Sequence, residues 1–318
     1  MKESFSLNNL ALEFVAATEQ AAIASARWIG KGDGKNADKA AVDAIRKRFN
    51  EINFCGEIVI SEGKKDKSFE LPMGEIVGLC KEPLIDIAVD PLECTASVAC
   101  GRPNAIAVIA AGPKGSLYHA VDSYMAKICA GPLAAKVIDL DASVQDNVEK
   151  TARALGKEVS EITVAVLDRP RHEKLIKELR EIGARVQLFT DGDIAMAVAT
   201  CLEDSPIDLM MGVGGSTEAV LASTALKCLG GQMFCRWQPP NEEHVKVLKD
   251  FGITEFNKIF SVEDLAQGPD VIFMATGVIV GPLLRGLVIG PKTITTHSVV
   301  MSSAPRTVRF VETRHQTK

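Results

Sequence analysis

The sequence contains few aromatic residues and no long apolar run. Aromatic residues make up 5% of the 318 positions, while hydrophobic residues as a whole make up 47%, so the core must rest on aliphatic side chains. A chain of this length and composition can bury a large core, and it lacks the low hydrophobicity of disordered proteins. No run of 18 apolar residues is present, and the first thirty residues, which include Glu3, Glu13 and Glu19, contain no signal-peptide core. We therefore expect a folded cytoplasmic protein that does not bind membranes.

Basic tracts and paired cysteines are also missing. The formal net charge is −5, and no cluster of Lys and Arg offers a surface for the phosphates of nucleic acid, so we expect no nucleic-acid partner. The eight cysteines are scattered without a CxxC pair. Scattered thiols indicate a reducing compartment and free cysteines, not a disulfide framework.

The first part of the chain predicts two helices followed by strands. Apolar residues recur every three or four positions over 7–28, and a second helical pattern covers about 37–50. Short apolar runs at 58–60, 84–89 and 104–111 are typical of buried strands.

The later part of the chain alternates between strand and helix patterns. Such alternation, with helices of about ten residues, predicts parallel β-α-β units. The expected strands are 162–167, 185–189, 208–213 and 270–276, with others near 293 and 308, and the expected helices are 173–182, 193–203 and 217–229. We expect an α/β fold with layered sheets and helices, in which two intimately joined halves, 1–135 and 136–318, form one unit.

The most informative segment is the acidic run that follows the strand at 84–89. A buried strand would deliver Asp90 to its carboxyl end, and Pro91 would break the ladder so that Glu93 and Thr95 face back toward Asp90. Carboxylates, with the Leu92 carbonyl as a further donor, suit hard cations such as Mg²⁺ or Mn²⁺. The alternative is that Asp90 and Glu93 are a strand-end cap and a solvated turn charge.

Two glycine-rich segments do not have the spacing of nucleotide-binding loops. Gly30 to Asn36 lacks the Ser or Thr that follows the lysine of a P-loop, and Gly212 to Gly215 lacks the third glycine of a dinucleotide fingerprint. The five histidines show no metal-ligand spacing. His172 follows the basic segment Arg169-Pro170-Arg171 in the chain, and we assign it no role of its own.

An ordered set of motifs resembles the class II fructose-1,6-bisphosphatases of bacteria, within the metal-dependent, lithium-sensitive phosphatase superfamily. The set is Gly32-Asp33, Asn36-Ala37-Asp38, Ser61-Glu62-Gly63, Asp90-Pro91-Leu92-Glu93-Cys94-Thr95, Asp168-Arg169-Pro170-Arg171-His172, Asp191-Gly192-Asp193 and Gly214-Gly215-Ser216-Thr217-Glu218. The resemblance spans nearly the whole chain, and it implies an N-terminal metal-binding half (1–135) and a C-terminal sugar-phosphate-binding half (136–318) with the site between them. It implies Mg²⁺ or Mn²⁺ ligands at Asp38, Glu62, Asp90, Glu93 and Glu218. Asp38 and Glu218 also fall where helices are expected to start, which suits a carboxylate but would equally suit a helix cap.

The resemblance also implies a set of substrate contacts. Arg169-Pro170-Arg171 would hold the phosphate remote from the metals, and Tyr124 would contact the substrate. Sugar hydroxyls would bind Asp191-Gly192-Asp193, with Gly215 allowing close approach, and the turn Glu93-Cys94-Thr95 would contact substrate as well. Without the resemblance, these segments would be a basic helix start, a packed tyrosine and an ordinary Asp-Gly-Asp turn.

Four features depart from the family pattern. Lys64, Lys65 and Lys67 follow Glu62 where the family is acidic, and Cys94 replaces a glycine, which would cost about 1 kcal/mol or more if φ there is positive. Lys35 is displaced by one position from a lysine of the family pattern, and Gly34 stands in that lysine's place. The segment 236–245 is shorter than in the family pattern.

The implied activity is hydrolysis of the 1-phosphate of fructose 1,6-bisphosphate, as in gluconeogenesis. Thr95 would orient the attacking water, with Glu62 or Asp38 accepting its proton. The alternatives are sedoheptulose bisphosphate or another sugar or inositol phosphate as substrate, and, in a different class, a catalytically weak sugar-phosphate-binding protein. The resemblance further implies a homodimer or homotetramer.

Overall fold

The computed structural model describes residues 7–61, 71–80 and 84–317, and the chain divides into two compact units. The first unit contains Met1–His119 together with Gln267–Lys318, and the second contains Ala120–Ala266. These limits differ from the expected halves, 1–135 and 136–318. The C-terminal strands pair with the first sheet through residues distant in sequence, and local patterning carries no information on such pairing.

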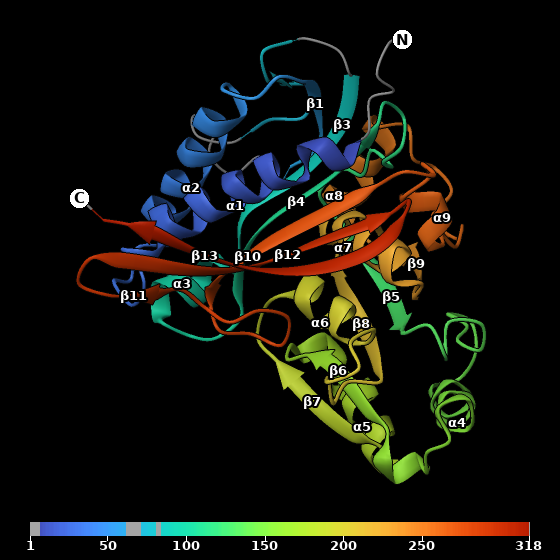
Figure 1. Cartoon of the computed structure of the whole chain (residues 1–318). Helices are drawn as coiled ribbons and strands as arrows, with labels where there is room; N and C mark the ends of the chain where they lie inside the picture. Colours follow the sequence, from blue (N-terminus) through green and yellow to red (C-terminus); the bar gives the residue numbers. More distant parts are fainter. Residues whose placement is uncertain (1–6, 62–70, 81–83, 318) are drawn as a thin grey trace. The chain divides into compact units, whose positions relative to one another are not determined.

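The first unit is built on a mixed sheet of eight strands among the described residues, in the order β11-β12-β10-β4-β3-β1-β2, with β13 also paired to β12 (Figure 1). Strands β1 and β3 are parallel and the other pairs are antiparallel. The bounds are β1 Cys55–Ser61, β2 Ile76–Val77, β3 Leu84–Glu93, β4 Ala105–Pro113, β10 Ile272–Ile279, β11 Val288–Ile289, β12 Thr293–Ser303 and β13 Arg306–Gln316.

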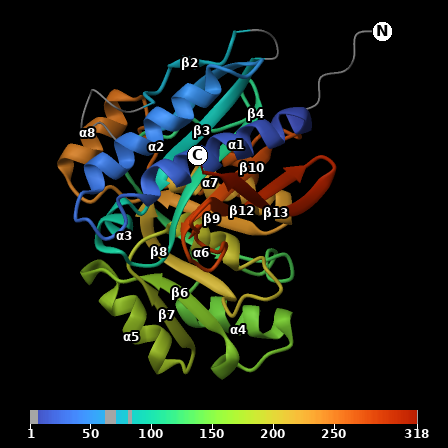
Figure 2. The same ribbon diagram turned by 60° about the vertical axis from the view of Figure 1, so that its left-hand side comes forward.

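Helices α1 (Ala11–Ala26), preceded by η1 (Leu7–Leu10), and α2 (Gly34–Phe49) pack side by side against this sheet (Figure 2). Their contact is centred on Phe14, Phe49 and Phe54, which are fully buried and meet edge to face with ring centroids 5.1–5.7 Å apart. These three aromatic rings thus form one cluster within a core that is otherwise mostly aliphatic. The short helix α3 (Thr95–Cys100) follows β3 directly.

The second unit has a five-stranded sheet in the order β7-β6-β8-β5-β9. The bounds are β5 Tyr124–Ala130, β6 Thr163–Leu167, β7 Arg185–Phe189, β8 Leu209–Gly215 and β9 Gln232–Trp237. As expected from the alternating pattern, β6 is parallel to β7 and to β8. Strands β5 and β9, which the sequence did not predict, are antiparallel additions.

Helices cover both faces of this second sheet. On one face, α4 (Val144–Leu155) and α5 (Glu173–Glu181) share a core with Ile128, Val164 and Val166. On the other face, α6 (Asp193–Ala199) bonds to Lys127, and α7 (Ser216–Leu229) packs on β5, β8 and β9. The remaining elements are η2 (Val159–Glu161), η3 (Pro170–His172), α8 (Glu242–Asp250) and α9 (Val262–Leu265). The α/β class expected from the sequence is confirmed. Within the described parts of the chain, no helix has the length and apolar character needed to cross a membrane.

Candidate active site

The acidic run continues strand β3 and does not end it. β3 extends through Pro91 to Glu93, and its pairing with β4 shifts between Asp90 and Glu93, so the expected turn at Pro91 is in fact a bulge within the ladder. Asp90 and Glu93 are 3% and 5% exposed, and the Leu92 N–H donates to Asp90 Oδ1 at 3.1 Å. The bulge therefore holds two buried carboxylates at the end of one strand. Asp86, earlier in the same run, has a structural role, because its Oδ2 accepts the Gly115 N–H at 2.7 Å.

The turn into α3 places the Thr95 hydroxyl next to this bulge. Cys94 is the N-cap residue with φ +70°, which is the left-handed conformation suspected at this position. Thr95 is the first helical residue, and its Oγ1 donates to the Leu92 carbonyl at 3.1 Å. A capping hydroxyl would accept an N–H, so the structure does not support the alternative of Thr95 as a cap.

Asp38 lies within α2, whose start differs from the expectation. The helix begins at Gly34, with Asp33 as N-cap accepting the Asn36 N–H at 3.0 Å, so Asp38 is in the second turn and gains little from the helix dipole. A Cβ added at Gly34 would lie 3.0 Å from Thr95 Cγ2, so the start of α2 touches the turn after β3. Glu62, like Lys64, Lys65 and Lys67, lies outside the described residues.

In the second unit, the two glycines that end β8 make room for two carboxylates. A side chain on Gly214 would overlap the carboxylate of Asp193, and a side chain on Gly215 would overlap that of Glu218. Gly215 is also the N-cap of α7, which makes Glu218 the third residue of that helix, in its first turn as expected. The sequence led us to expect that Gly215 allows close approach of the sugar; what the structure shows is that the two glycines accommodate the acids.

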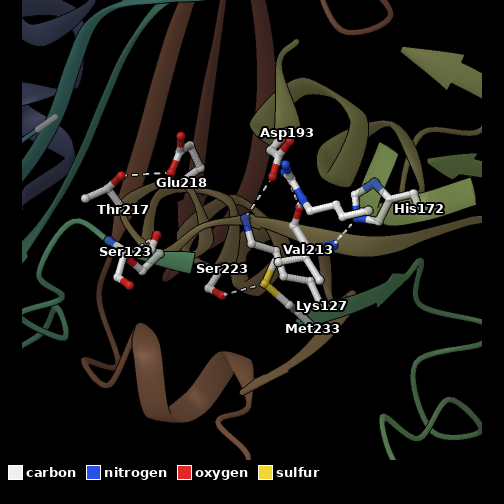
Figure 3. A network of polar contacts seen from close by, with 11 residues as sticks. Ser123, Lys127, His172, Asp193, Val213, Thr217, Glu218, Ser223 and Met233 are labelled. Atoms are coloured by element: carbon white, nitrogen blue, oxygen red, sulfur yellow. Dashed lines mark hydrogen bonds and ion pairs between the residues drawn. The ribbon is translucent and has the colours of Figure 1, made fainter. Parts of the chain in front are cut away.

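Lys127, a residue that the sequence did not single out, lies between these two acids (Figure 3). It is 3% exposed, and its Nζ donates to Asp193 Oδ2 at 3.0 Å. Burial alone lowers the pKa of Lys127, but the charges of Asp193 and Glu218 outweigh it and hold the pKa above its usual value. Burial raises the pKa of Glu218, against the pull of Lys127. One buried cation thus balances two acids.

Arg171 is held over Tyr124 by a strand carbonyl. Its Nε and Nη2 atoms donate to the Val213 carbonyl at 3.1 and 2.7 Å, and the guanidinium carbon lies 5.2 Å from the Tyr124 ring centroid. Tyr124 is opposite Gly215 in the β5–β8 ladder. The structure therefore brings together Tyr124, Arg171 and Gly215 of the expected substrate contacts. Arg169, two residues before Arg171 in the chain, is the N-cap of η3, and its Nη1 donates to the Asp168 carbonyl.

The Asp191-Gly192-Asp193 segment is a turn that starts a helix. Gly192 has φ +98°, a conformation that favours glycine, and Asp193 is the first residue of α6. Asp193 faces Lys127 and Gly214, so it belongs to the group of charges around Lys127, whereas Asp191 precedes the turn and is half-buried.

The donors present are of the kind that a hard divalent ion requires. Asp90, Glu93 and Asp38 in the first unit and Glu218 in the second are all carboxylates, and the Leu92 carbonyl lies in the same bulge. Among the described residues, which exclude Glu62, no three acidic, histidine or cysteine side chains come together closely enough to hold an ion. The ligand set therefore fits in chemical type, and its assembly is a proposal.

Comparison with known proteins places the chain in a family. Residues 8–315 match the family model described as bacterial fructose-1,6-bisphosphatase, glpX-encoded. The chain is 43% identical to a D-fructose 1,6-bisphosphatase class 2/sedoheptulose 1,7-bisphosphatase of Synechococcus sp. (strain JA-3-3Ab), over 97% of this chain and 96% of that protein. A protein of the same name from Trichodesmium erythraeum (strain IMS101) is 40% identical over the same shares. Among solved structures, an inositol monophosphatase from Anabaena (Nostoc) sp. PCC 7120 aligns with 79% of this chain and 98% of its own at 10% identity, with a TM-score of 0.34. The match over nearly the full length shows that this chain belongs to the bacterial class II fructose-1,6-bisphosphatase family.

Proposed function

We propose that the protein hydrolyses the 1-phosphate of fructose 1,6-bisphosphate, using a divalent ion. The observation that supports this most directly is the pairing of Arg171 with Tyr124 in the second unit, which offers a cation and an aromatic face to a sugar phosphate. Family membership supplies the substrate class, and the names of the relatives favour sedoheptulose 1,7-bisphosphate as a second substrate.

The chain's own residues would divide the work between binding and chemistry. Two of the five N–H donors of Arg171 bind Val213, and the remaining three would take the phosphate of sugar carbon 6, with Arg169 beside them. Asp193 and Asp191 would accept hydrogen bonds from sugar hydroxyls. The Thr95 hydroxyl, now donating to Leu92, would turn to orient the attacking water, and Asp38 or Glu62 would take its proton.

A divalent ion, Mg²⁺ or Mn²⁺, held by Asp38, Glu62, Asp90, Glu93 and Glu218 would supply the positive charge that lowers the pKa of water and stabilises the leaving alkoxide. A protein that only binds sugar phosphates would need the Arg171 group but not these acids. Phosphate release therefore separates the enzyme from the binding protein.

Phosphate release from a panel of sugar phosphates tests the proposal. Purified protein with Mg²⁺ or Mn²⁺ should release phosphate from fructose 1,6-bisphosphate faster than from inositol 1-phosphate, and sedoheptulose 1,7-bisphosphate measures the second substrate. Asp90→Ala and Glu218→Ala should lose activity while keeping the far-ultraviolet circular dichroism of the wild type. Near wild-type turnover of Asp90→Ala with metal in excess would refute the ligand assignment.

Thr95 provides a separate test of the chemistry. Thr95→Ala should fold and bind substrate but lose turnover by roughly 10²–10⁴-fold, and Thr95→Ser should be intermediate because it restores the hydroxyl. Equal turnover of Thr95→Ala and the wild type, combined with a lower melting temperature, would leave Thr95 only a structural role at the start of α3.

A further inference from the structure

His172 connects two strands that have stopped pairing with each other. The β6–β8 ladder contains only the pairs Val164 with Leu209 and Ala165 with Met210. Beyond them the imidazole of His172, 2% exposed, bridges the two strands, with Nδ1 2.6 Å from the Leu167 carbonyl and Nε2 2.8 Å from the Val213 nitrogen (Figure 3).

The two partners determine the protonation state of the ring. The Leu167 carbonyl can only accept and the Val213 N–H can only donate, so Nδ1 carries the proton and Nε2 is an acceptor. A protonated ring would present an N–H to the Val213 N–H and lose this bond. His172 is therefore bound as the neutral Nδ1–H tautomer.

The main chain of Val213 also binds the guanidinium that faces the proposed phosphate. The Val213 N–H binds His172, while the Val213 carbonyl accepts both bonds from Arg171, the residue next to His172 in the chain. Gly212 makes room for the ring: its φ is +143°, and a Cβ there would lie 3.0 Å from Nε2. The imidazole thus fixes the Val213 main chain through its N–H, and Arg171 binds the carbonyl of the same residue.

We propose that His172 is a positioning residue for phosphate binding, acting through the Val213 main chain to orient Arg171. This inference rests on the proposed function, in which Arg171 binds the phosphate remote from the reaction. His172 does not touch the substrate in this role. Its Nε2 lone pair fixes the place of Val213, and the Val213 carbonyl fixes the direction of the guanidinium.

Two amide variants separate the two bonds of the ring. In His172→Gln, the side-chain amide reaches the Nε2 position and can still accept the Val213 N–H. In His172→Asn, the amide reaches only the Nδ1 position and can still donate to Leu167. The probe is fructose 6-phosphate, the proposed product, which retains the remote phosphate, and its affinity is measured by calorimetry without metal.

The expected result is a loss of about tenfold in fructose 6-phosphate affinity for His172→Asn and near wild-type affinity for His172→Gln, since a charge-assisted contact is worth about one order of magnitude or more in affinity. With fructose 1,6-bisphosphate and metal, KM should rise in His172→Asn while kcat stays unchanged. Equal affinities of the wild type and His172→Asn, or equal losses in both variants, would overturn the proposal.

Controls distinguish this role from a merely structural one. Asp208 bridges the other ends of the same two strands, since its Oδ2 accepts the Thr163 N–H at 2.9 Å. Asp208→Asn should therefore lower the melting temperature without changing fructose 6-phosphate affinity.

If His172→Asn does not fold, Gly212→Ala provides a second test, because it disturbs the bond between His172 and Val213 with His172 in place. This variant should also weaken binding, and unchanged binding would overturn the proposal. Arg171→Ala tests the proposed function itself, because wild-type affinity in that variant would refute the phosphate site whatever His172 does.

Discussion

Cys94 occupies a backbone conformation that favours glycine. Its φ of +70° costs a residue with a Cβ roughly 1 kcal/mol or more, and its thiol is buried. We predict that Cys94→Gly is more stable than Cys94→Ala by about 1 kcal/mol, since both lose the thiol and only alanine keeps the strain. Urea denaturation measures the difference, and equal stability of the two variants would show that the backbone relaxes here without cost.

Lys127 and Asp193 form a buried ion pair whose members depend on each other. The lysine side chain is 1% exposed and the aspartate side chain 10%. Removing one partner of such a pair costs roughly 3–5 kcal/mol, because a buried charge is left uncompensated. We predict that Lys127→Met destabilises the protein by this amount, and that adding Asp193→Asn recovers at least about 1 kcal/mol of it.

The control for this prediction is the pair formed by Lys157 and Asp208 in the same unit. Lys157 is 39% exposed, so Lys157→Met should cost no more than about 1 kcal/mol. Strictly additive effects of Lys127→Met and Asp193→Asn in denaturant titrations would mean that the two charges are not coupled.

At the scale of elements, the contact made by η3 predicts how stability depends on pH. Burial lowers the pKa of His172, and the cations Arg171 and Arg169 lower it further, against the Leu167 carbonyl and Asp193. The folded protein therefore binds a proton less readily than the unfolded chain, whose histidine pKa is about 6.5. The stability that the neutral ring provides is fully present above pH 6.5 and is lost as pH falls through the lowered pKa.

We predict that the free energy of unfolding falls more steeply between pH 7.5 and 5.5 in the wild type than in His172→Gln, which has no titrating group at this position. Urea denaturation at several pH values gives the two slopes. His297, whose pKa is also lowered by burial, is present in both proteins and cancels in the comparison. Parallel slopes would contradict the assignment of a neutral ring.

The elements that the sequence predicted well are those with strong periodicity. The helix at 173–182 and the strand at 185–189 match α5 and β7 within one residue. For α5 the reason is that its buried residues recur at helical spacing among exposed ones. The second helix begins at Gly34 and not near 37, since Asp33 caps it through a local side-chain bond. Strand β5 was missed because Lys127 interrupts its apolar pattern, and that lysine is buried only because Asp193 comes from another element.

The sequence indicated some residues of the candidate site and not others, again because some contacts come from other elements of the fold. Motif resemblance pointed to Arg171, Tyr124, Asp193 and Glu218, which the structure places around Val213 and the end of β8. The contribution of His172 depends on two main-chain groups from different strands, and no spacing in the sequence reveals it.

At the scale of the whole molecule, the first unit is assembled from both ends of the chain. Strand β10 pairs with β4, with Ile272 opposite Ala111, and β12 and β13 continue the sheet from there. The second unit is a single continuous segment, Ala120–Ala266. Pairing between residues so distant in sequence follows from the packing of the complete core, so the order of successive segments along the chain carries no information on it.

Metal binding should stabilise the folded molecule as a whole. An ion that binds the folded chain at 100 times its dissociation constant adds about 2.7 kcal/mol to the free energy of unfolding. We predict that Mn²⁺ raises the melting temperature by a few degrees, that a chelator reverses the rise, and that Asp90→Asn abolishes it. Scanning calorimetry measures all three. An equal rise in the wild type and in Asp90→Asn would place the stabilising ion elsewhere.

The two glycines that end β8 limit the changes that the protein can tolerate during evolution. Any side chain at Gly214 displaces the Asp193 carboxylate, and any side chain at Gly215 displaces that of Glu218. Because each glycine serves a different acid, a change at one cannot be rescued by a change at the other. A library that seeks new sugar specificity should therefore keep both positions fixed and vary the surrounding side chains, such as Tyr124, which lies opposite Gly215 without sharing this constraint.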